Sequence, residues 1–204
     1  MKELRMFEFE IRAEENDAHG HFLTGRPIIY GQRTNVGRYD EVIEAGALDT
    51  TDLKDVRFLV NHNVSMIPLA RSRNNTENST MQMIVDGEGM MIRVDLDTTN
   101  NAEAKSLYSA VSRGDISGMS FMFIVDKDSW EDVDSGHPFR HVRSIQRVLE
   151  VSAVTFPAYS ATSIQTRGLS DALDSAMESL ESERARLAEI EKRKKKIRIM
   201  MEVS

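Results

Sequence analysis

Cysteine is absent from the 204-residue sequence, which excludes disulfide scaffolds, thiolate metal sites and cysteine nucleophiles. No apolar run approaches the roughly 18 residues that a membrane-spanning helix needs, and the N-terminus lacks the charged-then-apolar pattern of a secretory signal. We therefore expect a soluble, cytoplasmic protein without a membrane partner. Any chemistry must come from serine, threonine, histidine, lysine or carboxylate side chains.

The formal charge of −7 is unevenly distributed along the chain. Residues 168–204 hold eight acidic and eight basic side chains, so the whole acidic excess lies on residues 1–167. A nucleic-acid surface needs a basic stripe that replaces the phosphate counterions. We therefore expect that the body of the protein does not bind nucleic acid.

Alternating apolar and charged residues over 5–12 are typical of a half-buried strand. Two polar hairpin loops and two long later strands continue the β pattern, at 74–79, 86–89, 116–125 and 140–155. Between these parts, apolar spacing from Asn101 predicts one amphipathic helix that ends near Gly114. The patterns predict an α+β domain with a largely antiparallel sheet and helices packed outside it.

A second helical pattern follows Gly168. Apolar residues recur there at spacings of mostly three, four or seven, at Leu173, Met177, Leu180, Leu187, Ile190 and Ile197. Six of the seven residues from Lys192 to Arg198 are basic, and such charges near a helix C-terminus complement the helix dipole. The sequence therefore predicts a domain over 1–167 and an amphipathic helical tail with a basic end over 168–204.

His62 is the first candidate for a general base, because an unperturbed histidine titrates near neutral pH. It lies between Asn61 and Asn63 at the end of an apolar run, whereas His19 and His21 lie in a polar turn. On its own, the pattern also fits a loop or capping histidine.

Ser120 and Glu150 are the next candidates. Ser120 precedes alternating apolar residues on a predicted strand, which gives its hydroxyl the fixed orientation that a nucleophile requires. The surrounding segment lacks the second glycine of the Gly-x-Ser-x-Gly elbow. Glu150 lies in an otherwise apolar strand, where a carboxylate needs a partner and an imidazole would supply one. Taken singly, each residue also fits an ordinary structural role: Ser120 that of a buried serine in a strand, and Glu150 that of a water-facing glutamate on an edge strand.

Four blocks of sequence resemble, in their order and spacing, the tailed-phage prohead proteases, whose fold is similar to that of the herpesvirus assemblins. The blocks are Val42–Leu48, Leu59–Asn63 with Pro68–Arg71, Gly114–Phe121, and Glu150–Ala158. The resemblance covers roughly residues 5–165. It implies that the mostly antiparallel sheet of the α+β domain forms a closed or nearly closed β-barrel with flanking helices.

The resemblance also implies a serine endopeptidase in which Ser120 is the nucleophile, His62 the base and Glu150 the orienting residue. In assemblins the third member is a second histidine on a similar strand, so His141 stays an alternative to Glu150. Ser117 is the alternative nucleophile. Assemblins carry an arginine-bearing loop after that strand, whereas this chain has Pro157–Tyr159, so no oxyanion residues are transferred.

The resemblance further implies a phage or prophage enzyme that acts inside the immature capsid in the host cytoplasm. Its substrates would be the scaffold, or the scaffolding region of the major capsid protein, and the enzyme itself. A homodimer or higher oligomer stays open, because assemblins are activated by dimerising. No cofactor and no metal are expected. The tail from Ser170 onward is suited to helix-on-helix association with capsid or scaffold.

Three other functions compete with this one. The first is a non-catalytic capsid assembly or scaffolding protein, in which Ser120 is inert. The second is a serine protease with Lys105 as the base, which would need a buried lysine, although its sequence context favours an exposed helix face. The third is a metal hydrolase that uses His19 and His21, for which no further ligand lies nearby in the sequence.

Overall fold

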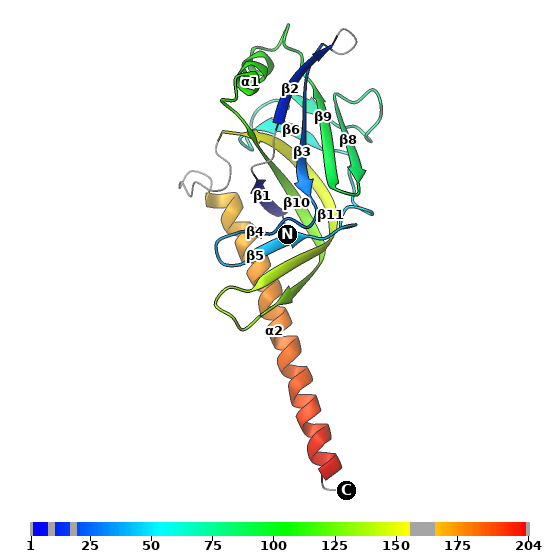
Figure 1. Cartoon of the computed structure of the whole chain (residues 1–204), viewed down its shortest axis with the longest axis vertical. Coiled ribbons are helices and arrows are strands. Elements are labelled where there is room, and N and C mark those ends of the chain that lie inside the picture. Colours follow the sequence, from blue (N-terminus) through cyan, green and yellow to red (C-terminus); the bar gives the residue numbers. More distant parts are fainter. Residues whose placement is uncertain (1, 8–10, 17–19, 156–165, 203–204) are drawn as a thin grey trace.

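The computed structural model describes residues 2–7, 11–16, 20–155 and 166–202. Within these residues, strands form a seven-stranded and a four-stranded sheet, with helix α1 (Ala102–Ser112) on the body. Helix α2 (Thr166–Glu202) starts beside the body and projects far beyond it (Figure 1). In the described part of the chain, no helix is long and apolar enough to cross a membrane.

The larger sheet is built around two long antiparallel strands, β10 (Gly118–Glu131) and β11 (Phe139–Val154). Strand β1 (Lys2–Phe7) pairs with the outer side of β10. The remaining strands of this sheet are β4 (Thr34–Asn35), β5 (Asp40–Ile43), β6 (Arg57–Val60) and β7 (Ala70–Arg71). Strands β5 and β6 both pair with β11 in parallel, at its beginning and near its end respectively.

The smaller sheet is antiparallel throughout, in the order β2, β3, β9, β8. Its strands are β2 (Ile11–Asn16), β3 (Gly20–Ile29), β8 (Met81–Asp86) and β9 (Gly89–Asp95). Gly89 is the first residue of β9, directly after the turn from β8, and has a φ of 141°. A Cβ atom there would lie 2.0 Å from the Ile28 carbonyl oxygen, so only glycine allows this close approach of β3.

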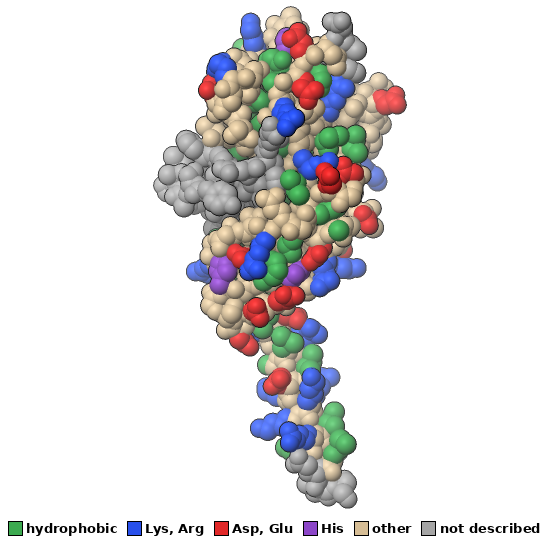
Figure 2. All heavy atoms as spheres, in the orientation of Figure 1, with side chains coloured by type: hydrophobic (Ala, Val, Ile, Leu, Met, Phe, Trp, Pro, Cys, Tyr) green, Lys and Arg blue, Asp and Glu red, His purple; other side chains and the backbone are tan. Residues whose placement is uncertain are grey.

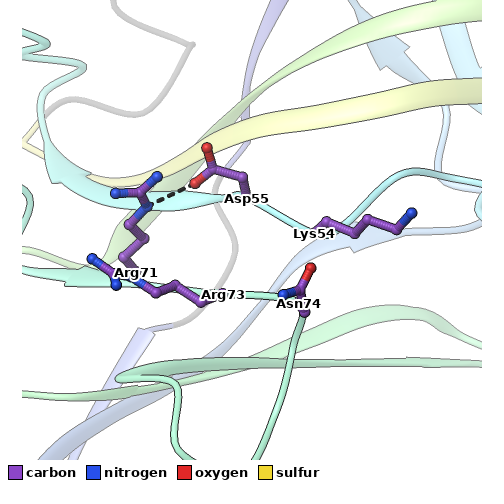
Figure 3. Close-up of a pocket in the computed structure, with 5 residues that line it drawn as sticks. All are labelled: Lys54, Asp55, Arg71, Arg73 and Asn74. Atoms are coloured by element: carbon purple, nitrogen blue, oxygen red, sulfur yellow. Dashed lines mark hydrogen bonds and ion pairs between the residues drawn. The ribbon is translucent and has the colours of Figure 1, made fainter.

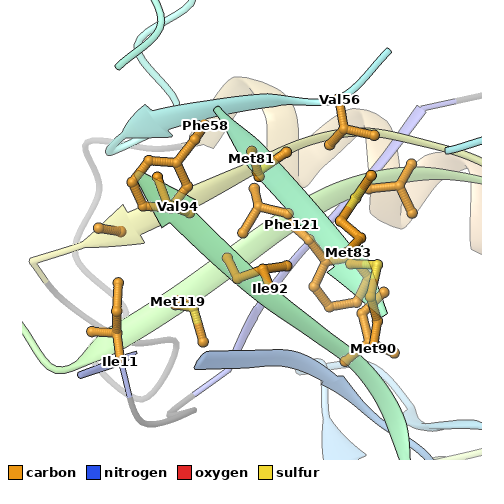
Figure 4. Packing of buried hydrophobic residues seen from close by; sticks show 14 of the residues in the cluster. Ile11, Val56, Phe58, Met81, Met83, Met90, Ile92, Val94, Met119 and Phe121 are labelled. Carbon is orange, nitrogen blue, oxygen red and sulfur yellow. The ribbon is translucent and has the colours of Figure 1, made fainter. Parts of the chain in front are cut away.

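The main core fills the space between the two sheets (Figure 4). Met119, Phe121 and Phe123 point into it from β10, and all three are fully buried. Successive side chains of a strand point to opposite faces. Ser120 and Met122 therefore point to the other face of the larger sheet, so the alternation of β10 decides the orientation of the candidate nucleophile.

Helix α1 forms where the spacing of apolar residues predicts it. Asn101 caps its N-terminus, because its side-chain oxygen accepts hydrogen bonds from the backbone N–H groups of Glu103 and Ala104. Ala104, Leu107 and Val111 are the buried residues of the helix. Lys105 lies on the exposed face, as its polar surroundings in the sequence predict.

Helix α2 docks on the body through a second, smaller core. Ala176 and Leu180 are fully buried against Tyr39, Trp130 and Val133, and Trp130 Nε1 donates a hydrogen bond to Ser179 Oγ at 3.1 Å. Farther along the helix the side chains are exposed, including Ile197 and Met201. On the face drawn in Figure 2, Lys and Arg side chains lie along this projecting part together with hydrophobic side chains.

The prediction of a closed or nearly closed barrel is wrong. A closed barrel gives every strand two hydrogen-bonded neighbours, whereas β1, β4 and β7 end the larger sheet and β2 and β8 end the smaller one. In the ranges that the structure describes, no ladder joins the two sheets. The larger sheet is mixed rather than antiparallel, because β5 and β6 both join β11 in parallel and the sheet forks there instead of continuing around.

The single strand expected over residues 5–12 is also wrong. Strand β1 ends at Phe7 and β2 begins at Ile11, and these two strands belong to different sheets. A half-buried alternation has the same period in either sheet, so the pattern does not show where the chain changes from one sheet to the other. The long strand expected over 140–155 is β11, which ends at Val154.

Candidate active site

Glu150 and Ser152 form the floor of the candidate site on β11. They are two residues apart, so their side chains point to the same face of the sheet, and both are buried. Ser152 Oγ donates a hydrogen bond to Glu150 Oε2 at 2.6 Å. Hydrogen bonds to ionised acceptors are among the stronger ones in proteins. The carboxylate is therefore held in place from its own strand.

His62 lies in the turn that follows β6. The backbone turns sharply there, with φ values of 50° at Asn61 and 56° at His62. Left-handed backbone is rare outside glycine but is adopted several times more often by asparagine and histidine. The Asn61 side chain bonds Thr155 through both its amide nitrogen and its oxygen, each at 2.9 Å, and Asn61 N donates to Ala153 O at 2.9 Å. These bonds hold the turn against the end of β11.

This turn brings the His62 ring over Glu150. His62 Nδ1 lies 2.5 Å from Glu150 Oε1, and only 10% of the His62 side chain is exposed. The His62 backbone N–H also donates to Ser152 Oγ at 3.2 Å. One serine hydroxyl thus contacts both the backbone of the histidine and the carboxylate that holds its ring.

The hydrogen bond with Glu150 fixes the tautomer of the His62 ring. Because a carboxylate accepts hydrogen bonds, the ring proton lies on Nδ1 and the lone pair lies on Nε2. Nε2 is buried and has no hydrogen-bond partner among the described residues. The ring therefore presents one acceptor nitrogen inside the site.

Ser120 lies on the neighbouring strand, directly opposite Ser152 in the β10–β11 ladder. Directly opposite residues share a face of the sheet, with Cβ atoms about 4.5–5.5 Å apart. The buried Ser120 therefore lies on the face that carries Ser152, Glu150 and the His62 ring. A serine hydroxyl, an imidazole and a carboxylate thus lie within one small region of three neighbouring strands.

This set of groups is suited to acyl transfer by a serine nucleophile. The comparisons with known proteins agree. A family model described as caudovirus prohead serine protease matches residues 7–175. The chain belongs to this family.

Two known proteins show how far the similarity extends. The prohead protease of Enterobacteria phage HK97 is 26% identical over 161 residues, which cover 78% of this chain and 64% of that relative. The structure of the bacteriophage T4 capsid assembly protease is 14% identical, with a TM-score of 0.40 over 76% of this chain and 99% of that one.

The structure does not bring the alternative third member, His141, to the same site. His141 lies nine residues before Glu150 on β11, about 30 Å away along the strand. Its Nδ1 lies 2.5 Å from Glu44 Oε1, and its Nε2 lies 3.4 Å from Glu131 Oε1. His141 is therefore part of a separate group of charges near the beginning of β11.

Ser117, the alternative nucleophile, is exposed and lies immediately before β10. Ser120 is already inside the strand and opposite Ser152. The ladder therefore holds Ser120, but not Ser117, on the sheet face that carries Ser152 and Glu150.

His21 contacts residues unrelated to the site, because its Nδ1 lies 2.7 Å from Thr98 Oγ1 and its Nε2 lies 3.6 Å from Glu15 Oε1. His19 lies outside the described residues. Within the part of the chain that the structure covers, no three His, Asp or Glu side chains are grouped to hold a metal ion.

Reasoning from the sequence missed Ser152 and the clamp made by Asn61. A signal for Ser152 was present, because it lies two residues after Glu150 on a predicted strand and must share its face. The Asn61 clamp had no local signal, since its partner Thr155 lies 94 residues away.

Proposed function

We propose that this chain is a serine endopeptidase of phage capsid maturation, with Ser120 as nucleophile, His62 as general base and Glu150 as the residue that orients the imidazole. The observation that carries the proposal is the 2.5 Å contact between His62 Nδ1 and Glu150 Oε1, next to a serine fixed by its ladder position. Membership of the prohead serine protease family supports the same chemistry.

In the proposed reaction, His62 Nε2 takes the proton from Ser120 Oγ while that oxygen bonds to the scissile carbonyl carbon. The imidazolium then gives the proton to the leaving amine as the carbon–nitrogen bond breaks, which leaves an acyl-enzyme. His62 next removes a proton from water, which attacks the ester and releases Ser120 and a carboxylic acid product. A positioned base of this kind usually contributes about 10²- to 10⁴-fold to the rate.

Glu150 acts through His62 rather than on the substrate. Its bond to Nδ1 keeps the lone pair on Nε2 before the reaction, and its charge stabilises the imidazolium that forms during it. Ser152 in turn holds Glu150 through the 2.6 Å hydrogen bond and the His62 backbone through the 3.2 Å one. Glu150 and Ser152 are therefore positioning residues.

We further propose that the substrates are scaffold, or the scaffolding region of the major capsid protein, and the chain itself, and that cleavage takes place inside the immature capsid in the host cytoplasm. The family description and the name of the HK97 relative, prohead protease, support this proposal. The same proposal includes assembly of this chain into a homodimer or a higher oligomer.

The projecting part of α2 gives a physical route to packaging of the enzyme. Its exposed apolar residues extend the face that docks Ala176 and Leu180 on the body, and they can pack against a helix of scaffold or capsid protein. In this proposal the chain divides into a protease domain over 1–167, which cleaves, and a helical tail over 168–204, which packages the enzyme.

A fluorophosphonate probe tests the nucleophile without knowledge of the substrate, because it phosphonylates activated serines. We expect labelling at Ser120, located by mass spectrometry, in the wild type and in Ser117→Ala. We expect no labelling in Ser120→Ala or His62→Ala. The same four proteins should be incubated with the proposed substrate, the major capsid protein of the same phage. Equal cleavage by wild type and Ser120→Ala would rule out the proposed function.

A further inference from the structure

A cavity of about 420 Å³ opens at the start of β6 (Figure 3). It is lined by Lys54, Asp55, Arg71, Arg73 and Asn74. Basic side chains are unexpected here, because the body of the protein carries the whole acidic excess of the chain. The cavity is thus a local reversal of the surface charge.

Among the described residues, the one carboxylate that lines this cavity is that of Asp55, and two arginines already bind this carboxylate. Asp55 Oδ1 accepts a hydrogen bond from Arg71 Nε at 2.7 Å, and Asp55 Oδ2 lies 3.4 Å from Arg57 Nη2. The bond from Arg71 holds the pKa of Asp55 below its ordinary value, so the carboxylate stays ionised. In the described residues, the exposed Lys54 and Arg73 side chains make no ion pair. Their two positive charges are left for a ligand.

The cavity lies on the same sheet face as the candidate active site. Arg57 is opposite Glu150 in the β6–β11 ladder, and Arg71 is opposite Arg57 in the β6–β7 ladder. Opposite residues share a face, so Arg57 and Arg71 point the same way as Glu150. Lys54 and Arg73 lie three residues before Arg57 and two residues after Arg71, so the spacing of the strands places each of them roughly 19 Å from Ser120.

We propose that this cavity is a subsite for an acidic side chain of the polypeptide substrate, about six residues from the scissile bond. An extended peptide advances about 3.3 Å per residue, so six residues span the distance from Ser120 to the cavity. The planar guanidinium of Arg73 can bind a carboxylate through two parallel hydrogen bonds, and Lys54, whose side chain extends in the opposite direction in Figure 3, adds a second charge to the field of the cavity. The inference rests on the proposed function, since it names a substrate feature that the same enzyme reads.

The subsite has a clear reason to exist. An acidic body repels acidic polypeptide segments, and charged groups beside a cleft raise the local concentration of substrates of opposite charge. A carboxylate in the substrate that reaches Lys54 and Arg73 replaces this repulsion by attraction. Exposed charge pairs are individually weak, so two of them give about a fivefold to tenfold preference.

The test profiles cleavage of a library of peptides derived from a bacterial proteome. The wild type should show Asp and Glu enriched about five to seven residues from the cleaved bond on one side. Lys54→Gln/Arg73→Gln should lose this enrichment, with kcat/KM for the best acidic peptide reduced about fivefold to tenfold and that for its glutamine counterpart unchanged. The matched control Arg38→Gln/Lys127→Gln removes one exposed arginine and one exposed lysine elsewhere and should keep the preference.

A binding measurement separates failure of the subsite from failure of the enzyme. The full-length Ser120→Ala protein, with and without Lys54→Gln/Arg73→Gln, is titrated with fluorescent peptides that differ only in Glu or Gln at one position. Preference for the Glu peptide that disappears in the variant supports the subsite even if no peptide is cleaved. Cleavage without an acidic preference overturns the subsite and leaves the protease intact. Binding of inorganic phosphate without preference for the Glu peptide likewise overturns it.

Discussion

His62 Nδ1 lies 2.5 Å from Glu150 Oε1, although 88 residues separate these two side chains in the sequence. The contact arises because β6 pairs in parallel with the last part of β11, which places the turn after β6 beside Glu150. The left-handed backbone at Asn61 and His62 then folds the ring back over the sheet. Backbone in sparsely populated regions is often found at functional sites, held by its surroundings.

Replacing Glu150 by Gln should reduce kcat by about 10²- to 10⁴-fold with little change in KM. Glutamine has nearly the same shape, but its amide does not stabilise the imidazolium and can hold the wrong tautomer of His62. Steady-state cleavage of a peptide substrate measures both constants. Glu44→Gln removes the carboxylate that contacts His141 and serves as the matched control, for which we expect activity close to wild type. Normal activity of Glu150→Gln together with a reduced kcat of Glu44→Gln would instead assign the orienting role to His141.

Replacing Ser152 by Ala should lower both stability and activity. The substitution leaves one oxygen of the buried Glu150 and the N–H of His62 without their partner, and an unmet buried group costs about 1–3 kcal/mol of unfolding free energy. Urea denaturation measures that loss. Because the histidine is less firmly held, kcat should fall about tenfold while KM changes little.

A loss of stability alone would affect kcat differently. If Ser152→Ala were only less stable, lowering the assay temperature until the protein is fully folded would restore kcat. We expect the reduced kcat to persist under those conditions.

The pattern of the sequence predicted those features that depend on local period. Alternation predicted the long strands and the orientation of Ser120, and apolar spacing predicted helix α1. Barrel closure was taken from an analogous fold and was wrong, because pairing between distant strands has no local signal. The parallel pairing of β6 with β11, on which the His62–Glu150 contact depends, is of the same kind.

Asp86 should contribute stability that depends on pH. The Arg26 guanidinium donates two hydrogen bonds to this carboxylate, at 2.6 and 2.7 Å, and lowers its pKa to about 2. A lowered folded pKa stabilises the fold fully above the unfolded pKa of about 4, and this contribution is lost as the pH falls toward 2. The wild type should therefore be more stable than Asp86→Asn at pH 6, and the difference should shrink between about pH 4 and 2. Chemical denaturation at several pH values measures it, and a constant difference would contradict the assignment.

Removing the projecting part of α2 should abolish packaging without loss of stability or of enzyme activity. A chain that ends at Leu187 keeps Ala176 and Leu180, which cover Tyr39 and Trp130, so its unfolding temperature and peptide cleavage should match the full chain. Deleting all residues from 168 onward instead uncovers this second core and should destabilise the body, so it cannot separate the two roles. Quantifying the protease in purified proheads measures packaging.

The full-length variant Ile197→Gln/Met201→Gln, which keeps every charge of the tail, should also be packaged poorly, because the proposed contact buries these apolar side chains. Normal packaging of both proteins would show that the tail is not the packaging element.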